Sequence, residues 1–195
     1  MNKTKLVNCF LSGRRKSISK YENQTEELQS KVLQKLIRQA IHTEWGQTHG
    51  FAQVNDYNSF TKTSPINTYE ELKGYIDRMR RGEKDVLWSG KVRWYAKSSG
   101  TTNDKSKFIP VSKECLQDTH YRGGTDAVAL YLGQNPRSRM FDGKALILGG
   151  SHSPNYNLPH SLVGDLSAIL IENVSPFVNH FRCLLYTSDA ADDLT

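Results

Sequence analysis

Residues 92–112 read VRWYAKSSGTTNDKSKFIPVS, and this stretch has a pattern typical of two strands joined by a polar loop. Val92–Ala96 is apolar and aromatic, which favours a β-strand. Phe108–Val111 predicts a second strand, and Pro110 indicates that it is short or lies at a sheet edge. The loop between them, Lys97–Lys107, contains several hydroxyl side chains, one glycine and three lysines.

The composition of this loop suits the binding of an anion. Gly100 permits close approach of the backbone to a ligand and a positive φ. Successive backbone N–H groups in such a turn can hold a phosphate, and hydroxyls and a lysine ammonium add further donors. The loop is not a Walker A motif, because the G-x-x-x-x-G-K-[ST] spacing is absent. An ordinary polar hairpin loop remains an equally good interpretation of the composition alone.

Two amphipathic helices are predicted before this stretch. The first runs from Thr25, a candidate N-cap, to Trp45, with Gly46 as a stop signal. The second begins at Thr68, where Glu71 three residues later completes a capping box, and ends at Gly82. Its expected buried face consists of Leu72, Tyr75, Ile76 and Met79.

Helical and strand patterns alternate in the second half of the chain. Ser112 is the expected cap of a third helix that stops at Gly133. Ala145–Leu148 predicts a buried strand, and Leu166–Ile171 fits either a helix or a strand. Strands alternating with helices favour an α/β or mixed fold. The residues expected to share the buried face of the third helix are Leu116, Thr119, Gly123, Ala127, Leu130 and Tyr131.

The overall composition excludes several classes of protein. The chain has 195 residues, 37% of them hydrophobic, so it is not disordered. It has no apolar run long enough to span a membrane. Three cysteines without metal-like spacing indicate a cytoplasmic protein, and no histidine pair has the spacing of metal ligands, so no metal ligand is assigned.

The net charge of +6 includes two short basic clusters, at residues 14–16 and 78–81. They fit either solvated helix ends or a surface for nucleic acid or an acidic membrane. No zinc-finger or RNA-binding signature accompanies them. We therefore expect neither nucleic acid nor membrane as a partner.

The last thirteen residues have a different character from the rest. Residues 183–192, CLLYTSDAAD, resemble the translation of a sequencing adapter, although a natural tail is the alternative. We therefore expect residues 1–182 to form the native portion and residues 183–195 to be a non-native tail.

The central motif, Ser98-Ser99-Gly100-Thr101-Thr102 with Lys107, resembles the phosphate-binding motif of adenylate-forming enzymes. It is most similar to that of the auxin-responsive Gretchen Hagen 3 family of acyl-acid amido synthetases, especially its bacterial members. Other segments fit the same family, so the resemblance covers nearly all of residues 1–182. These segments are YEELK at 69–73 with IDR at 76–78, TEWG at 43–46 with HGF at 49–51, and GDLSAILIE at 164–172.

This resemblance implies a fold and a reaction. Residues 1–182 would be the N-terminal part of the large α/β domain of an adenylate-forming enzyme, which is incomplete here. ATP and a small carboxylic acid would give an acyl-adenylate and pyrophosphate, and an amino acid would then form an amide and release AMP. Mg²⁺ would assist. The cofactor-binding residues implied are Ser98, Ser99, Gly100, Thr101, Thr102 and Lys107.

Several points stay open at this level. The catalytic residues are unknown, and later motifs and a C-terminal domain that the family uses are not in residues 1–182, so we expect the chain to be inactive alone. One alternative is an acyl-adenylating ligase that transfers the acyl group to a thiol in place of the amine. The other is a basic nucleic-acid-binding protein.

Two glycine pairs are weaker candidates for functional positions. Gly123-Gly124 indicates close helix packing or an acyl pocket. Gly149-Gly150-Ser151-His152 indicates a structural turn or a ligand site at a strand end.

Overall fold

The computed structural model describes residues 3–98, 106–179 and 182–186, which fold as two compact units. One unit comprises residues 24–112 and 153–164, and contains the predicted hairpin. The other comprises residues 1–23, 113–152 and 165–195. Both combine helices with short strands, so the α/β expectation is confirmed. Among the described residues, no helix has the length and apolar character needed to cross a membrane.

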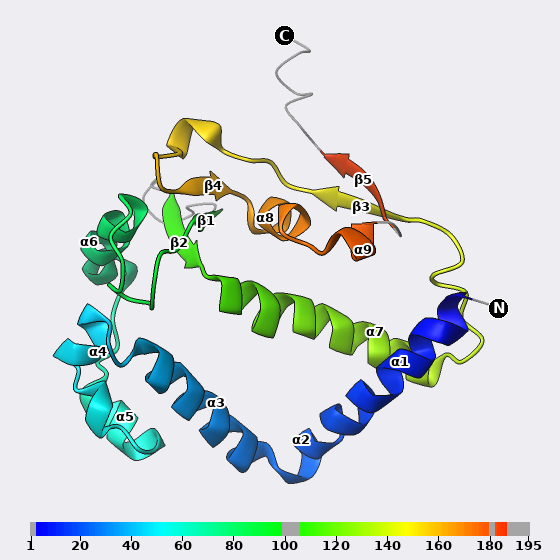
Figure 1. The fold of residues 1–195 in the computed structure, drawn as a ribbon, viewed down its shortest axis with the longest axis horizontal. Helices are drawn as coiled ribbons and strands as arrows, with labels where there is room; N and C mark the ends of the chain where they lie inside the picture. The colour runs from blue at the N-terminus through cyan, green and yellow to red at the C-terminus, as the bar shows by residue number, and fades with distance from the viewer. Residues whose placement is uncertain (1–2, 99–105, 180–181, 187–195) are drawn as a thin grey trace. The chain divides into compact units, whose positions relative to one another are not determined.

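The hairpin unit is built around a three-stranded sheet in the order β2-β1-β4. Strand β1 (Trp94–Ser98) pairs antiparallel with β2 (Lys107–Val111) and parallel with β4 (Leu162–Gly164). Strand β2 therefore lies at the sheet edge, as Pro110 predicts, and helix α6 (Tyr69–Arg80) lies beside it (Figure 1). The remaining helices are α3 (Thr25–Ala40), α4 (Glu44–Thr48), α5 (Tyr57–Thr63) and the 3₁₀ turns η1 (Phe51–Gln53) and η3 (Pro154–Tyr156).

Helix α6 begins and packs as its sequence predicts. The Glu71 carboxylate accepts hydrogen bonds from the Thr68 backbone N–H (2.6 Å) and hydroxyl (2.8 Å), and the backbone bond lowers the pKa of Glu71. Ile76 and Met79 are buried in one core cluster, with Leu72 and Tyr75 packed against it. The expected face of this helix is confirmed.

The helix predicted over residues 25–45 is wrong in its C-terminal part. Helix α3 ends at Ala40, and α4 begins after Thr43. The Thr43 hydroxyl donates to the Ala40 carbonyl (2.7 Å) and accepts from the Gly46 N–H (3.0 Å), so Thr43 both ends one helix and caps the next. Gly46 is therefore a close-packed position inside α4 and not a stop. The N-cap of α3 is Gln24, one residue before the predicted Thr25.

A cluster of charges joins α4 to the end of α6. Arg78 forms ion pairs with Glu44, 2.5 Å away, and with Glu83. These hydrogen bonds lower the pKa of both carboxyl groups. Part of the basic cluster at 78–81 therefore serves internal contacts.

The buried strand residue Tyr95 gives a prediction for alkaline pH. Its side chain is 0% exposed, and burial raises the pKa of Tyr95 from 10.0 to about 12. Between those values the unfolded chain releases a proton that the folded chain keeps, so folding stability falls by about 1.4 kcal/mol per pH unit. Tyr95→Phe should remove this loss between pH 10 and 12, as measured by urea unfolding. Tyr57→Phe, at a position 69% exposed, should keep it; equal slopes in both variants would contradict the assignment.

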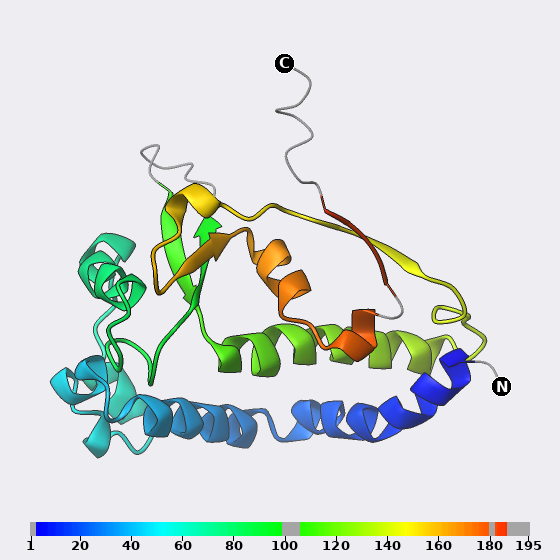
Figure 2. The same cartoon turned by 45° about the horizontal axis from the view of Figure 1, so that its top comes forward.

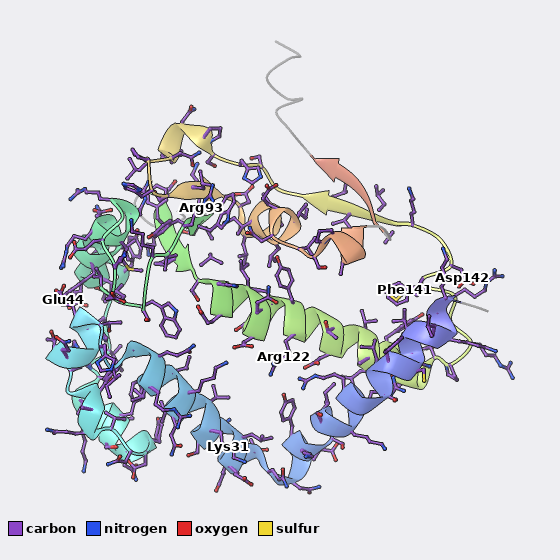
Figure 3. The ribbon with its side chains drawn as sticks, in the orientation of Figure 1. Lys31, Glu44, Arg93, Arg122, Phe141 and Asp142 are labelled. Atoms are coloured by element: carbon purple, nitrogen blue, oxygen red, sulfur yellow. The ribbon has the colours of Figure 1, made fainter. Side chains whose placement is uncertain are left out.

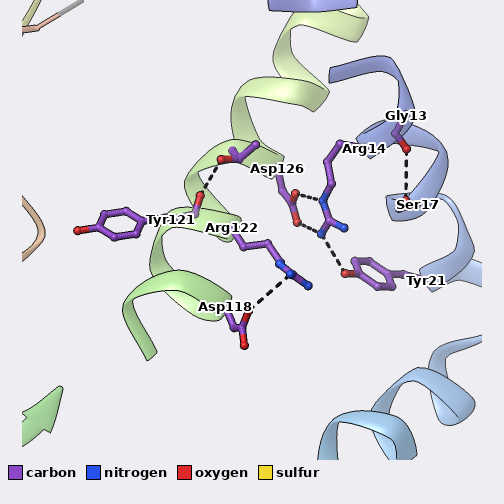
Figure 4. A network of polar contacts seen from close by, with 9 residues as sticks. Gly13, Arg14, Ser17, Tyr21, Asp118, Tyr121, Arg122 and Asp126 are labelled. Carbon is purple, nitrogen blue, oxygen red and sulfur yellow. Dashed lines mark hydrogen bonds and ion pairs between the residues drawn. The ribbon is translucent and has the colours of Figure 1, made fainter. Parts of the chain in front are cut away.

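In the other unit, helix α1 (Lys3–Ile18) runs antiparallel to α7 (Arg122–Gln134) (Figure 2). Arg14 forms a two-point ion pair with Asp126, with Nε–Oδ1 2.5 Å and Nη2–Oδ2 2.7 Å, and also donates to the Tyr21 hydroxyl (Figure 4). Arg15 donates to the Asn8 side-chain oxygen (2.7 Å) and to the Ala129 carbonyl (3.3 Å). Arg14 and Arg15 of the N-terminal basic cluster therefore serve folding contacts.

The start of α1 is held by polar contacts as well. The Thr4 hydroxyl donates to Asp142 (3.2 Å) and accepts from the Phe141 N–H (3.0 Å), and Figure 3 shows Phe141 and Asp142 beside the start of the helix. The sequence analysis assigned no element to this region. Helix α2 (Lys20–Asn23) follows α1.

The predicted buried face of the third helix is confirmed at Leu116 but wrong after it, because the helix changes its winding. Residues Cys115–Tyr121 are π-helical before α7 begins. A π turn adds a residue to each turn, so the phase of the following helix shifts. The buried residues of α7 are Ala129 and Leu132, whereas Leu130 and Tyr131 are exposed.

Strand β3 (Ala145–Gly149) is also more exposed than predicted. It forms a two-stranded parallel sheet with β5 (Arg182–Tyr186). Helix α8 (Leu166–Glu172) packs against β3, on the face of Gly149, while Leu146 and Leu148 on the other face are 61% and 65% exposed. The apolar run 166–171 is thus a helix, and α9 (Pro176–Asn179) follows it.

Candidate functional site

The predicted phosphate-binding segment is the connection of the β1–β2 hairpin. Strand β1 ends at Ser98 and β2 begins at Lys107, and these two residues are paired across the ladder. The predicted hairpin is confirmed, but its strands reach further into the predicted loop, because β1 covers Trp94–Ser98 where Val92–Ala96 was expected, and β2 includes Lys107. The other predicted site residues, Ser99, Gly100, Thr101 and Thr102, lie outside the described residues.

Lys107 is positioned by an aromatic residue of α6. Its ammonium lies 5.5 Å from the centroid of the Tyr69 ring. The Tyr69 hydroxyl accepts a hydrogen bond from the backbone N–H of Phe108 (2.9 Å). Tyr69 therefore satisfies an outward-facing donor of the edge strand and holds the first residues of β2.

Lys97, on the other strand of the hairpin, has a similar setting. Its ammonium lies 4.5 Å from the centroid of the Tyr156 ring. Arg80 donates to the Tyr156 carbonyl (2.7 Å), and its guanidinium carbon lies 3.9 Å from the centroid of the Phe108 ring. The Phe108 and Tyr156 ring centroids are 5.6 Å apart. Cations and aromatic rings therefore alternate where β1 and β2 meet the connecting segment. We call this region, made of Lys97, Lys107, Arg80 and the rings beside them, the base of the hairpin.

The predicted cofactor-binding residues include none of Lys97, Arg80 and Tyr156. Lys97 could have been found, because it directly precedes Ser98. Arg80 and Tyr156 carry no local signal for this place, since 76 positions separate them in the sequence. Only the pairing of β4 with β1 brings the Tyr156 turn to the hairpin.

The charged side chains described at this site are cations without carboxylate partners. Arg80 is only 9% exposed, and its Nε has no hydrogen-bond partner among the described residues. Over that same part of the chain, Lys97, Arg80 and Lys107 form no ion pair. Aromatic faces attract a cation without neutralising its charge. The base of the hairpin therefore keeps a local positive charge suited to an anionic ligand.

The described residues do not form a metal site. No group of three or more His, Cys, Asp or Glu side chains among them could hold an ion.

The glycine pair at the end of β3 forms a tightly packed turn. The Ser151 N–H donates to the Asp165 carboxylate (3.0 Å), and the Gly150 N–H donates to the Ser167 hydroxyl (2.8 Å). A Cβ on Gly150 would lie 2.2 Å from an Asp165 carboxylate oxygen. This geometry agrees with the structural-turn interpretation.

The second glycine pair is not closely packed. A Cβ on either Gly123 or Gly124 would meet nothing within 4 Å among the described residues. The expectation of close helix packing there is wrong, because the phase shift after the π turn leaves both positions exposed.

Comparison with known proteins identifies the family. A model of the GH3 family N-terminal domain matches residues 14–187. The chain belongs to the GH3 family. The match includes residues 183–187 of the expected non-native tail, so the boundary at residue 182 remains a prediction.

Similar proteins agree with this GH3 assignment. The chain is 32% identical over 108 residues to jasmonoyl-L-amino acid synthetase JAR6 of Nicotiana attenuata, covering 53% of this chain and 19% of that protein. It is 32% identical over 93 residues to indole-3-acetic acid-amido synthetase GH3.15 of Arabidopsis thaliana, covering 47% and 16%. The chain thus matches less than a fifth of the length of these relatives.

A solved structure supports the same fold. The GH3.15 acyl acid amido synthetase in complex with 2,4-DB superposes with a TM-score of 0.65 at 22% identity, over 87% of this chain and 29% of that one. At this identity the likeness shows the shared fold alone.

Proposed function

We propose that this GH3 chain is the phosphate-binding part of an ATP-dependent ligase that joins a carboxylic acid to an amino acid. The observation that carries the proposal is the paired ends of the hairpin, Ser98 and Lys107, on either side of a segment with the motif's composition. Family membership and the amido synthetase names of the relatives support it. No structural observation favours a thiol acceptor.

In the proposed reaction, the carboxylate of the acid attacks the α-phosphorus of ATP, and pyrophosphate leaves. The amine of the amino acid then attacks the acyl carbon, and AMP leaves. Charge builds on the departing pyrophosphate, so fixed donors that face it lower the barrier. We assign this role to Ser98, Ser99, Gly100, Thr101, Thr102 and Lys107.

The chain's own contribution is to bind and orient the polyphosphate. Tyr69 holds the Phe108 backbone and lies beside the Lys107 ammonium, which limits the positions that this cation can take. Mg²⁺ would enter with the nucleotide, because this ion is usually held by one or two carboxylates together with substrate phosphates, and no step here depends on it. Because the chain matches only a small part of its relatives' length, we propose that it binds polyphosphate but does not complete adenylation by itself. Recovery of pyrophosphate exchange activity from the 195-residue chain would overturn this statement.

The location and partners follow from the same proposal. We propose a cytoplasmic protein, because three cysteines without metal-like spacing suit a reducing compartment. Its partners would be the small acid and the amino acid. Internal contacts of Arg14, Arg15 and Arg78 give the nucleic-acid alternative less support.

Titration of the chain with ATP and with tripolyphosphate tests the proposal. Lys107→Met should weaken binding at least tenfold, because a hydrogen bond between charged groups is lost. Gly100→Val should weaken it as well, because the backbone can no longer approach the phosphates closely. Lys62→Met removes one charge from the exposed face of α5 and serves as the matched control, with affinity expected within twofold of the parent.

Two results would contradict the proposal. One is equal affinity in the parent, Lys107→Met and Gly100→Val. The other is filter binding of nucleic acid, with a steep salt dependence, that both substitutions leave intact.

A further inference from the structure

Several arginines elsewhere in the described chain form ion pairs with carboxylates. Arg14 pairs with Asp126, Arg78 with Glu44 and Glu83, and Arg139 with Asp142. The three cations at the base of the hairpin form no ion pair among the described residues, and each lies against an aromatic ring: Lys97 on Tyr156, Arg80 on Phe108 and Lys107 on Tyr69.

Arg80 is the buried cation of this group, and its burial carries an energetic cost. Arg80 is nine-tenths buried with an unpartnered Nε, and a buried cation without a counter-charge is costly. An anion bound nearby would offset part of this cost. The arrangement thus favours an anionic ligand at the base of the hairpin.

The register of the hairpin determines where Lys97 lies. Lys97 pairs with Phe108, and Ser98 pairs with Lys107. Residues paired in a ladder share a face, and successive residues alternate. Lys97 and Lys107 therefore extend from opposite faces of the hairpin, one just before the connecting segment and one at its end.

We propose that Lys97 is a second phosphate-binding cation, which contacts the polyphosphate of the nucleotide from the face opposite Lys107. This assignment rests on the proposed function and adds a residue to it. Tyr156 holds the Lys97 ammonium half-buried and unneutralised, so the charge remains available to the ligand. Arg80 is a positioning residue, because it fixes Tyr156 through its carbonyl and Phe108 through its ring.

Calorimetric titration of the chain with tripolyphosphate tests the assignment. Lys97→Met should raise the Kd about tenfold, which corresponds to about 1.4 kcal/mol. Lys97→Arg, which keeps the charge, should bind within about threefold of the parent. Lys62→Met is the control for loss of one positive charge at a distance, and circular dichroism checks that each variant is folded.

A second measurement needs no substitution. Because the Lys97 ammonium lies 4.5 Å from the centroid of the Tyr156 ring, the ring current should shift the NMR signals of the Lys97 side chain, and tripolyphosphate should move these signals with the same saturation curve as the heat of binding. An unmoved Lys97 signal, together with an unchanged Kd in Lys97→Met, would overturn the assignment.

The outcomes separate the two proposals. Binding that depends on Lys107 but not on Lys97 leaves the proposed function standing and overturns the role of Lys97. Absence of tripolyphosphate binding by the parent chain overturns both.

Discussion

Replacing Gly46 with alanine is expected to destabilise the fold by at least 3 kcal/mol. A Cβ at this position would lie 2.0 Å from the Ala40 carbonyl oxygen, 2.9 Å from its carbon and 3.2 Å from the Ile41 Cα. All three atoms belong to the backbone, so no side-chain rotation can relieve the clash. Inserting a methyl group into such a contact forces backbone shifts, which cost more than usual overpacking.

The clash at Gly46 would also disrupt the junction between α3 and α4. Separating the two helices also breaks both hydrogen bonds of the Thr43 hydroxyl, to the Ala40 carbonyl and from the Gly46 N–H. Equilibrium unfolding in urea measures the loss. Gly74→Ala is the matched control, because a Cβ there meets nothing within 4 Å and alanine is the better helix former by about 1 kcal/mol. Equal unfolding midpoints for the two variants would contradict the α3–α4 packing.

Replacing Gly150 with alanine is expected to cost about 2 kcal/mol. The new Cβ would lie 2.2 Å from an Asp165 carboxylate oxygen and 2.6 Å from the Asp165 Cβ. The Asp165 side chain would have to move away, and the Ser151 N–H would lose its acceptor. Gly143→Ala is the control, because its Cβ has open space.

A double-mutant cycle identifies the cause of this loss. Asp165→Ala alone should destabilise the turn, since it removes the acceptor of the Ser151 N–H. In the Asp165→Ala background, Gly150→Ala no longer meets the carboxylate but still meets the Cβ of residue 165 at 2.6 Å, so its cost should fall below 2 kcal/mol without disappearing. Neighbouring residues that share a contact show this non-additivity. Strictly additive losses would show that the side chain of Asp165 does not contact Gly150.

Elements with local signals could be predicted closely. The capping box of Thr68 and Glu71 acts within four residues, and α6 begins where it indicates. Pro110 cannot donate to a ladder, and β2 lies at the edge. The hairpin was predicted from the change to a polar run at Lys97, but pairing across the ladder extends β1 to Ser98 and starts β2 at Lys107.

Elements whose geometry depends on distant partners could not be predicted. The π turn at Cys115–Tyr121 shifted the buried face of α7, and no periodicity rule contains such a shift. The apolar run of β3 predicted burial, but α8 packs against only one face of its sheet. Helix α1 is held by Arg14 and Arg15 contacts to residues more than 100 positions away.

The sequence by itself determined the hairpin, its hydroxyl-rich connection with Gly100, the lysine at its end and the resemblance to one family. Only the tertiary structure decided how the cations at its base are held. Arg80 and Tyr156 meet because β4 pairs with β1, which seats Lys97 on an aromatic ring and Arg80 away from any described carboxylate. Local patterns reflect backbone preferences over a few residues, whereas the charge balance of a site depends on which distant side chains folding brings together.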